Sequence, residues 1–254
     1  MEVRSLAITR MTGKWHQRYP HLSCAITPVA QMVAKLRDDP TLELEGRLGT
    51  IDSSSGRFVA GVSRAQIDRI IEMMQNSSHV HSDDEWVEEQ DFFFRVENTH
   101  CRTRVRYDSQ EMSLKTNTIE KTVIATHDIA IVPHDEGRER VDMRISLKQE
   151  RPVFQLQSCV NTSLVRIKQR RRFTTLDNTW AFDFSMLWSG ATKTEAESRQ
   201  ASLDPLFEVE CELIDVERSI SVNGDDNKIA TSLLLKMCDL LPTPSTECSV
   251  SLVA

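Results

Sequence analysis

Two short segments near opposite ends of the sequence alternate glutamate with apolar residues, LELEGRLG at 42–49 and FEVECEL at 207–213. In a β-strand, alternate residues share a face and lie roughly 6.6 Å apart, and carboxylates arranged in this way repel each other unless a cation or water lies among them. If both strands meet in the fold, they predict a site for a hard, oxygen-binding cation such as Mg²⁺ or Mn²⁺. The alternative is a solvated strand face, which is the commoner fate of a single E-x-E pattern. The candidate metal ligands are Glu43, Glu45, Glu208, Glu210 and Glu212.

The composition predicts a folded chain in an intracellular, reducing compartment. With 254 residues, 27% of them charged, and only eight glycines, the chain is long enough for one large or two small domains. It has no apolar run long enough for a membrane span, and its first residues lack the apolar core of a secretion signal. The six cysteines have no C-x-x-C spacing, which favours reduced thiols over disulfides or zinc sites.

The net charge of −7 argues against binding along the length of a nucleic acid, because affinity there grows with each phosphate neutralised. Basic residues are nevertheless concentrated in a few segments of the region from 92 to 185. Short alternating runs separated by turn residues are typical of antiparallel strands. The concentration of basic residues in these strands suits recognition of one compact polyanion.

The basic segments place charged side chains on one strand face and apolar side chains on the other. Segment 163–173, for example, has Val165 and Ile167 opposite its basic residues. Strands are expected at 42–49, 92–96, 100–108, 119–125, 141–150, 163–173, 179–186 and 207–214. The charged-face residues are Arg102, Arg104 and Arg106; Arg144, Ser146, Lys148 and Glu150; Arg166, Lys168, Arg170 and Arg172; and Asp183 and Ser185.

Two architectures fit this pattern. In a sandwich the charged faces would point to solvent, but solvent faces usually mix signs, because like charges opposite each other destabilise a sheet. Here whole strands carry a single sign. If amphipathic helices cover the apolar faces from outside, about eight strands can close into a barrel whose interior holds a small ligand. Glutamates on one wall and basic side chains on another suit a triphosphate with a divalent ion.

Three segments have the periodicity of amphipathic helices. Thr27 and Pro28 predict the start of the first helix, and Ser63 with Gln66 predicts a capping box at the second. The intervening polar segments are expected to be irregular. The helices are expected at 27–38, 63–76 and 229–241, a solvated acidic loop or edge within 76–91, and a polar linker at 189–204.

Four motifs occur in the order seen in the fungal and protozoan metal-dependent mRNA 5′-triphosphatases, which belong to the triphosphate tunnel metalloenzyme superfamily. The motifs are E-x-E-x-R-L-G at 43–49, D-x-R-I-S-x-x-x-E at 142–150, R-x-K-x-R at 166–170 and E-x-E-x-E at 208–212. Each is weak alone, but together they resemble that family over most of the chain, and the short length is similar to the compact protozoan members.

The resemblance implies a mainly β, α+β fold, a closed eight-stranded antiparallel β-barrel tunnel with helices packed on the outside. It implies one tunnel domain over 1–254. The parts of that domain would be an N-terminal extension at 1–26, the tunnel core at 27–222, and a C-terminal helix and tail at 223–254.

The resemblance also implies hydrolysis of the γ-phosphate of 5′-triphosphate RNA to give 5′-diphosphate RNA, the first step of mRNA cap formation, with Mg²⁺ or Mn²⁺. In that family pattern Glu43, Glu45 and Glu212 hold the metal and Glu150 orients the attacking water. Further residues implied in catalysis are Arg104, Lys121, Arg166, Lys168, Arg170 and Asp183, and those implied in substrate binding are Arg47, Arg102, Arg106, Arg144, Lys148, Arg172 and Ser185.

One departure from the family pattern affects the phosphate site. Ala181 stands where an arginine is expected, two residues before Asp183. Either Arg172 or another basic residue takes the role of that arginine, or this strand contributes less to phosphate binding.

Rival functions are open within and outside the superfamily. Thiamine triphosphatases, inorganic tripolyphosphatases and class IV adenylyl cyclases also have charged tunnels, but their first strand generally has E-x-E-x-K, whereas Arg47 followed by Leu48 and Gly49 favours the capping branch. A non-catalytic polyanion-binding module would explain the basic strands but not the glutamates. The implied partners are the 5′ end of nascent RNA, nucleoside triphosphates or tripolyphosphate, and a capping guanylyltransferase, with no membrane; the implied location is the nucleus.

Overall fold

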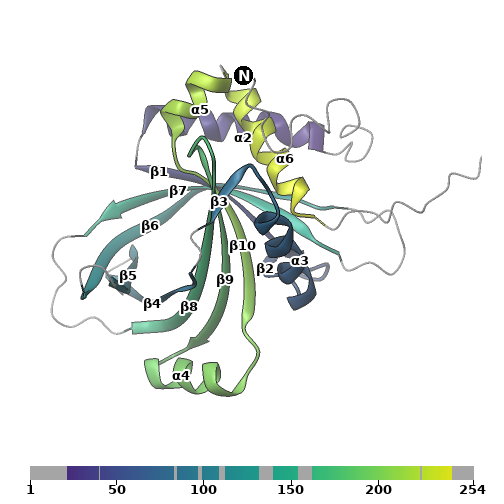
Figure 1. The fold of residues 1–254 in the computed structure, drawn as a ribbon. Coiled ribbons are helices and arrows are strands. Elements are labelled where there is room, and N and C mark those ends of the chain that lie inside the picture. Colours follow the sequence, from purple (N-terminus) through teal and green to yellow (C-terminus); the bar gives the residue numbers. More distant parts are fainter. Residues whose placement is uncertain are drawn as a thin grey trace, which may run out of the picture.

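Eight antiparallel strands close into a barrel, and helices pack on its outside (Figure 1). The computed structural model describes residues 22–39, 41–82, 85–96, 99–108, 112–131, 140–153, 162–223 and 225–241. The expected N-terminal extension up to residue 21 and the expected tail from residue 242 lie outside these ranges. The expectation of a closed eight-stranded antiparallel barrel with external helices is confirmed.

The strands follow one another around the barrel in the order β1, β7, β6, β5, β4, β8, β9 and β10, and β10 pairs back with β1. Short strands β2 (Phe58–Ala60) and β3 (Val80–Ser82) pair with β1 and β8 outside this ring. The barrel strands are β1 (Leu42–Ile51), β4 (Val87–Val96), β5 (Thr99–Asp108), β6 (Ser113–Ile129), β7 (Asp142–Pro152), β8 (Thr162–Thr175), β9 (Trp180–Gly190) and β10 (Leu206–Leu213).

The apolar faces of the strands form the main core between the barrel wall and the helices. On β1, Leu44 and Leu48 are fully buried, and Met237 of the last helix belongs to the same core. Gly46 allows this helix to approach, since a Cβ at that position would lie 2.7 Å from the Met237 sulfur. Burial of the apolar face outside the barrel leaves the charged alternate residues inside it.

Five helices are described: α2 (Leu22–Asp38), α3 (Arg64–Gln75), α4 (Lys193–Ser202), α5 (Val216–Asn223) and α6 (Asp226–Asp239). The predicted capping box of α3 is present, because the Ser63 side chain accepts from the Gln66 amide and the Gln66 side chain accepts from the Ser63 amide. Helix α2 begins five residues earlier than predicted and contains Pro28 in its interior. None of the described helices has the length and apolar character needed to cross a membrane.

The predicted linker at 189–204 is wrong, because it contains α4. Thr192 caps this helix, its hydroxyl accepting from the Glu195 amide. Ala196 is fully buried against Val165 and Ile167 of β8. These two β8 residues face outward, as expected. The helix that covers them buries only one residue, so its sequence shows no apolar stripe from which a helix could be predicted.

Candidate functional site

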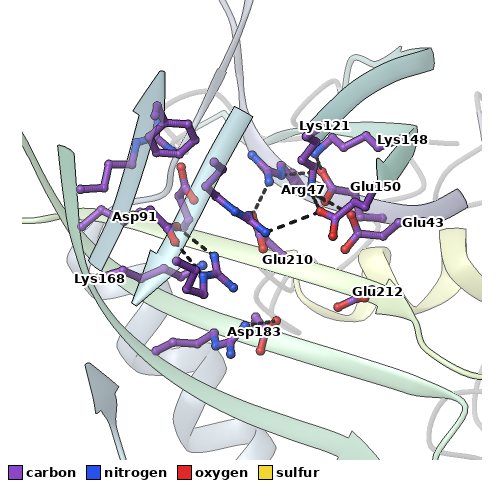
Figure 2. A pocket seen from close by; sticks show the side chains of 18 of the residues that line it. Glu43, Arg47, Asp91, Lys121, Lys148, Glu150, Lys168, Asp183, Glu210 and Glu212 are labelled. Atoms are coloured by element: carbon purple, nitrogen blue, oxygen red, sulfur yellow. Dashed lines mark hydrogen bonds and ion pairs between the residues drawn. The ribbon is translucent and has the colours of Figure 1, made fainter. Parts of the chain in front are cut away.

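The barrel encloses a cavity of about 400 Å³ whose wall is almost entirely charged. Eight carboxylates and nine arginine or lysine side chains line it (Figure 2). Sixteen of the residues predicted from sequence meet here: Glu43, Glu45, Arg47, Arg102, Arg104, Lys121, Lys148, Glu150, Arg166, Lys168, Arg170, Arg172, Asp183, Glu208, Glu210 and Glu212.

Three predicted site residues do not line the cavity. Arg144 instead donates two hydrogen bonds to Asp128, at 2.6 and 2.7 Å, and its guanidinium carbon lies 4.8 Å from the centroid of the Phe58 ring. Ser185 is completely buried in the wall, between Arg170 and Glu208 in register. Arg106 shares the strand face of Arg104 but lies further along β5, beyond the cavity. Strand alternation predicted the face of each residue correctly but not its distance along the barrel.

Glu43 of β1 and Glu212 of β10 form a hydrogen-bonded carboxyl pair. Burial, and then the negative charge of Glu43, raises the pKa of Glu212 to about 7. Burial acts in the same direction on Glu43, but Lys121 and then Lys148 outweigh it, so the pKa of Glu43 is lowered. Two buried carboxyl groups this close titrate as a pair, and the pair takes up a proton more readily than an isolated glutamate does.

Two lysines neutralise the carboxylates on this side of the cavity, where Glu43, Glu150, Lys121 and Lys148 gather (Figure 2). Lys121 of β6 donates to Glu43 at 2.8 Å and to Glu150 at 2.6 Å. Lys148 of β7 donates to Glu45, and burial lowers the pKa of this lysine. Arg47 forms ion pairs with both Glu45, at 2.8 Å, and Glu210, at 2.7 Å.

Glu89 and Asp91 of β4 also face the charged interior, which corrects the prediction that the acidic stretch 76–91 is a solvated loop or edge. Asp91 accepts two hydrogen bonds from Arg104, at 2.7 and 2.9 Å. Glu89 is 1% exposed and accepts from Arg170 at 2.7 Å. The signal in the sequence was the same alternation used elsewhere, since these residues and Phe93 continue one face of the strand predicted from residue 92.

Arg172 contacts carboxylates on both sides of Ala181. It donates two hydrogen bonds to Asp183, at 2.8 and 2.6 Å, and one to Glu212 at 3.0 Å. Glu212 is the register partner of Ala181, which is fully buried. Arg172 therefore lies beside Ala181 on the cavity wall, and its taking the role of the expected arginine stays a prediction.

Three cations of the cavity are poorly neutralised. Arg166 and Lys168 of β8 have no ion pair within the described part of the chain, and Lys168 is only 5% exposed. Arg102 of β5 comes no closer to a carboxylate than 3.7 Å, the distance of its guanidinium from Glu150. Burial and the adjacent Arg104 lower the pKa of Arg102. Buried positive charge without a partner is costly, so these residues favour an anionic ligand.

The carboxylates partly fit a divalent cation. Glu43 and Glu212 already touch, and Glu45 is the register partner of Glu212, so three oxygen donors of the type preferred by Mg²⁺ or Mn²⁺ face one region. Among the described residues, however, no three acidic, histidine or cysteine side chains converge as a preformed metal site. Lys121 donates to Glu43 and Lys148 donates to Glu45.

Solved structures with the same fold include the Pct1 RNA triphosphatase of S. pombe, with a TM-score of 0.60, 15% identity, and coverage of 87% of this chain and 90% of that chain. The same protein in complex with the Spt5 CTD gives 0.61 at 16% identity, covering 85% and 90%. The RNA triphosphatase domain of a mimivirus mRNA capping enzyme gives 0.53 at 15% identity, covering 85% and 96%. Neither a protein-family model nor a curated protein matches the chain. At these identities the likeness shows the tunnel fold alone.

Proposed function

We propose that this protein is a divalent-metal-dependent RNA 5′-triphosphatase, which hydrolyses the γ-phosphate of 5′-triphosphate RNA and leaves a 5′-diphosphate end for cap formation. The observation that carries the proposal is the division of charge in the cavity. Arg102 and Arg166 carry buried Nε donors without a hydrogen-bond partner among the described residues. The Glu43–Glu212 pair is still short of positive charge despite its contacts with Lys121 and Arg172, since the pKa of Glu212 is raised. A polyphosphate bound with a divalent cation satisfies both needs at once.

Glu43, Glu45 and Glu212 would hold the cation. When bound, it supplies polarisation of a γ-phosphate oxygen and part of the positive charge needed in the transition state. Lys121 and Lys148, which neutralise two of these carboxylates in the free protein, would then be released toward phosphate oxygens. The same lysines would thus neutralise the carboxylates and bind the phosphates of the substrate.

Glu150 is the proposed residue that orients water. It lies on the cavity wall, with Lys121 at 2.6 Å and Arg102 at 3.7 Å from one carboxylate oxygen. As the bond from the water oxygen to the γ-phosphorus forms, the bond to the bridging oxygen breaks, and Glu150 accepts the proton released by water. The products are inorganic phosphate and the diphosphate end. Lys168 stabilises the charge on the equatorial oxygens, since phosphoryl transfer depends mainly on positioning and electrostatics.

The substrate would be recognised by its end. The negative net charge leaves little to gain from contacts along an RNA chain, whereas the cavity volume of about 400 Å³ accommodates a triphosphate group. Nucleoside triphosphates and tripolyphosphate carry the same group and are proposed as further substrates. A role in capping would place the protein in the nucleus beside a guanylyltransferase, and both remain parts of this proposal.

The test is release of inorganic phosphate from γ-labelled RNA, ATP and tripolyphosphate, in Mg²⁺, Mn²⁺ and EDTA. We expect release from all three substrates only with a divalent metal, and loss of at least a hundredfold in Glu43→Gln and Glu212→Gln, which keep size and remove charge. Glu88→Gln, which changes an exposed side chain on the outward face of β4, is the matched control and keeps full activity. Metal-independent release would contradict the proposal. Tight tripolyphosphate binding without turnover would instead indicate a polyanion-binding module.

A further inference from the structure

Phe93 is the only aromatic side chain among the described residues that line the charged cavity. It lies on the inward face of β4, directly opposite Arg102 of β5 in register. Val123 and Leu187 are the other apolar lining residues. An aromatic ring among seventeen charged side chains contributes nothing to the binding of phosphate, so its place in this wall requires another explanation.

The Arg166 guanidinium lies over the Phe93 ring, with its central carbon 5.2 Å from the ring centroid. The register partner of Arg166 is Asp91, but both oxygens of that carboxylate accept from Arg104. The buried Nε atom of Arg166 has no hydrogen-bond partner in the part of the chain described. Arg166 is therefore held by the ring rather than by a carboxylate, and its planar face and N–H groups are available to a ligand.

Arg102, on the other side of Phe93, also has a donor without a hydrogen-bond partner. Its Nε atom is buried and unpaired within the described residues, and its nearest carboxylate, that of Glu150, lies at 3.7 Å. The cavity thus contains one flat apolar surface flanked by two arginines with unsatisfied donors. A ligand that complements this arrangement carries an anionic group and an aromatic group in one molecule, as a nucleotide does with its phosphates and its base.

We propose that the Phe93–Arg166 pair binds the nucleoside attached to the triphosphate, by stacking of the base on this platform. The proposal rests on the proposed function of the cavity and adds which part of the substrate is bound beyond the phosphates. Stacking is tolerant of sequence because every base has a π face, so the platform would favour nucleoside-bearing polyphosphates over inorganic tripolyphosphate without selecting one base.

The test compares ATP with inorganic tripolyphosphate, because both carry the triphosphate and only ATP carries a base. Dissociation constants are measured by calorimetry in EDTA, and KM values in Mn²⁺, for the wild type and Phe93→Leu. We expect the substitution to weaken ATP binding roughly tenfold, as the loss of one stacked base predicts, and to change tripolyphosphate binding less than twofold. Phe93→Tyr, which keeps the ring, should retain the wild-type ratio of the two constants.

Phe92→Leu is the matched control, because Phe92 is the next residue on β4 and packs outward against Val165 and Ile167. It should lower the melting temperature and leave the ratio of ATP to tripolyphosphate binding unchanged. If Phe93→Leu weakens both ligands equally, Phe93 only supports Arg166 and the inference is overturned. It is likewise overturned if neither constant changes. A wild type that hydrolyses neither ligand refutes the proposed activity, while the calorimetric ratio still decides the role of Phe93.

Discussion

Replacing Glu212 by glutamine should stabilise the metal-free protein, and more strongly as the pH rises. The carboxyl of Glu212 is hydrogen-bonded to Glu43, and burial with the negative charge of Glu43 raises its pKa to about 7 from an ordinary value of 4.5. A carboxyl whose pKa is raised on folding contributes stability that is fully present below the unfolded pKa and is lost as the pH rises through the folded pKa. The relevant window is therefore about pH 4.5 to 7.

The size of the effect follows from the pKa shift. Each unit corresponds to about 1.4 kcal/mol, so the full shift sets an upper limit of about 3 kcal/mol. The Glu212 side chain is 25% exposed, and solvent screening reduces that figure to about 1–2 kcal/mol. In a chain of this size this corresponds to roughly 3–6 °C in melting temperature. Glutamine mimics the protonated carboxyl at every pH, so it removes this loss.

The assay is the melting temperature of wild type and Glu212→Gln in EDTA at several pH values from 5 to 8. Glu210→Gln is a control of opposite sign on the same strand face. Burial acts to raise the pKa of Glu210, but Arg47 and then Lys168 outweigh it and lower the pKa well below its usual range. Its substitution should therefore destabilise the protein by a constant amount between pH 5 and 8. An equal difference between Glu212→Gln and wild type at pH 5 and pH 8 would refute the reasoning.

Three further predictions concern the cavity and the wall. Arg166→Lys should lower γ-phosphate release at least tenfold with the melting temperature unchanged, because the point charge of lysine cannot replace the planar, two-pronged guanidinium on phosphate oxygens. If neither the release rate nor the melting temperature changes, Arg166 lies outside the site. RNA affinity, measured by fluorescence anisotropy, should depend on the 5′-triphosphate and hardly on the length of the RNA, since an acidic protein gains little from counterion release. A steep rise in affinity with RNA length, at a fixed end group, would contradict binding by the 5′ end. Gly190→Ala should lower the free energy of unfolding by about 1–3 kcal/mol, because the new Cβ would lie 2.6 Å from the Ala196 backbone nitrogen of α4. An unchanged midpoint of chemical denaturation would show that α4 moves freely.

The closed barrel and the facing of its strands were predictable because alternation depends on strand geometry alone. Once Val165 and Ile167 are outside, Arg166 and Lys168 must be inside, whatever the neighbouring strands are. The four motifs added the expectation that both glutamate strands meet, which the pairing of Glu45 with Glu212 bears out.

The neutralisation of individual charges was not predictable, because it depends on register between strands distant in sequence. Asp91 could pair with Arg104 or with Arg166, both of which are its register partners, and the structure shows that Arg104 takes both oxygens. The sequence did not predict Phe93 as a site residue, because an aromatic residue in a strand usually belongs to a core. Helix α4 was missed because it buries only Ala196.

The pairing of β1 with β10 has a consequence for how the protein is made. These strands lie near the two ends of the described chain, yet they supply the carboxyl pair and close the ring. During synthesis Glu43 and Glu45 leave the ribosome long before β10, so the carboxyl pair of Glu43 and Glu212 cannot form until residues of β10 have emerged. Closing so long a loop is slow, because its entropy must be overcome before the contacts form. The charged cavity is therefore expected to be complete only in the last step of folding, and a chain that lacks β10 would not contain the proposed site.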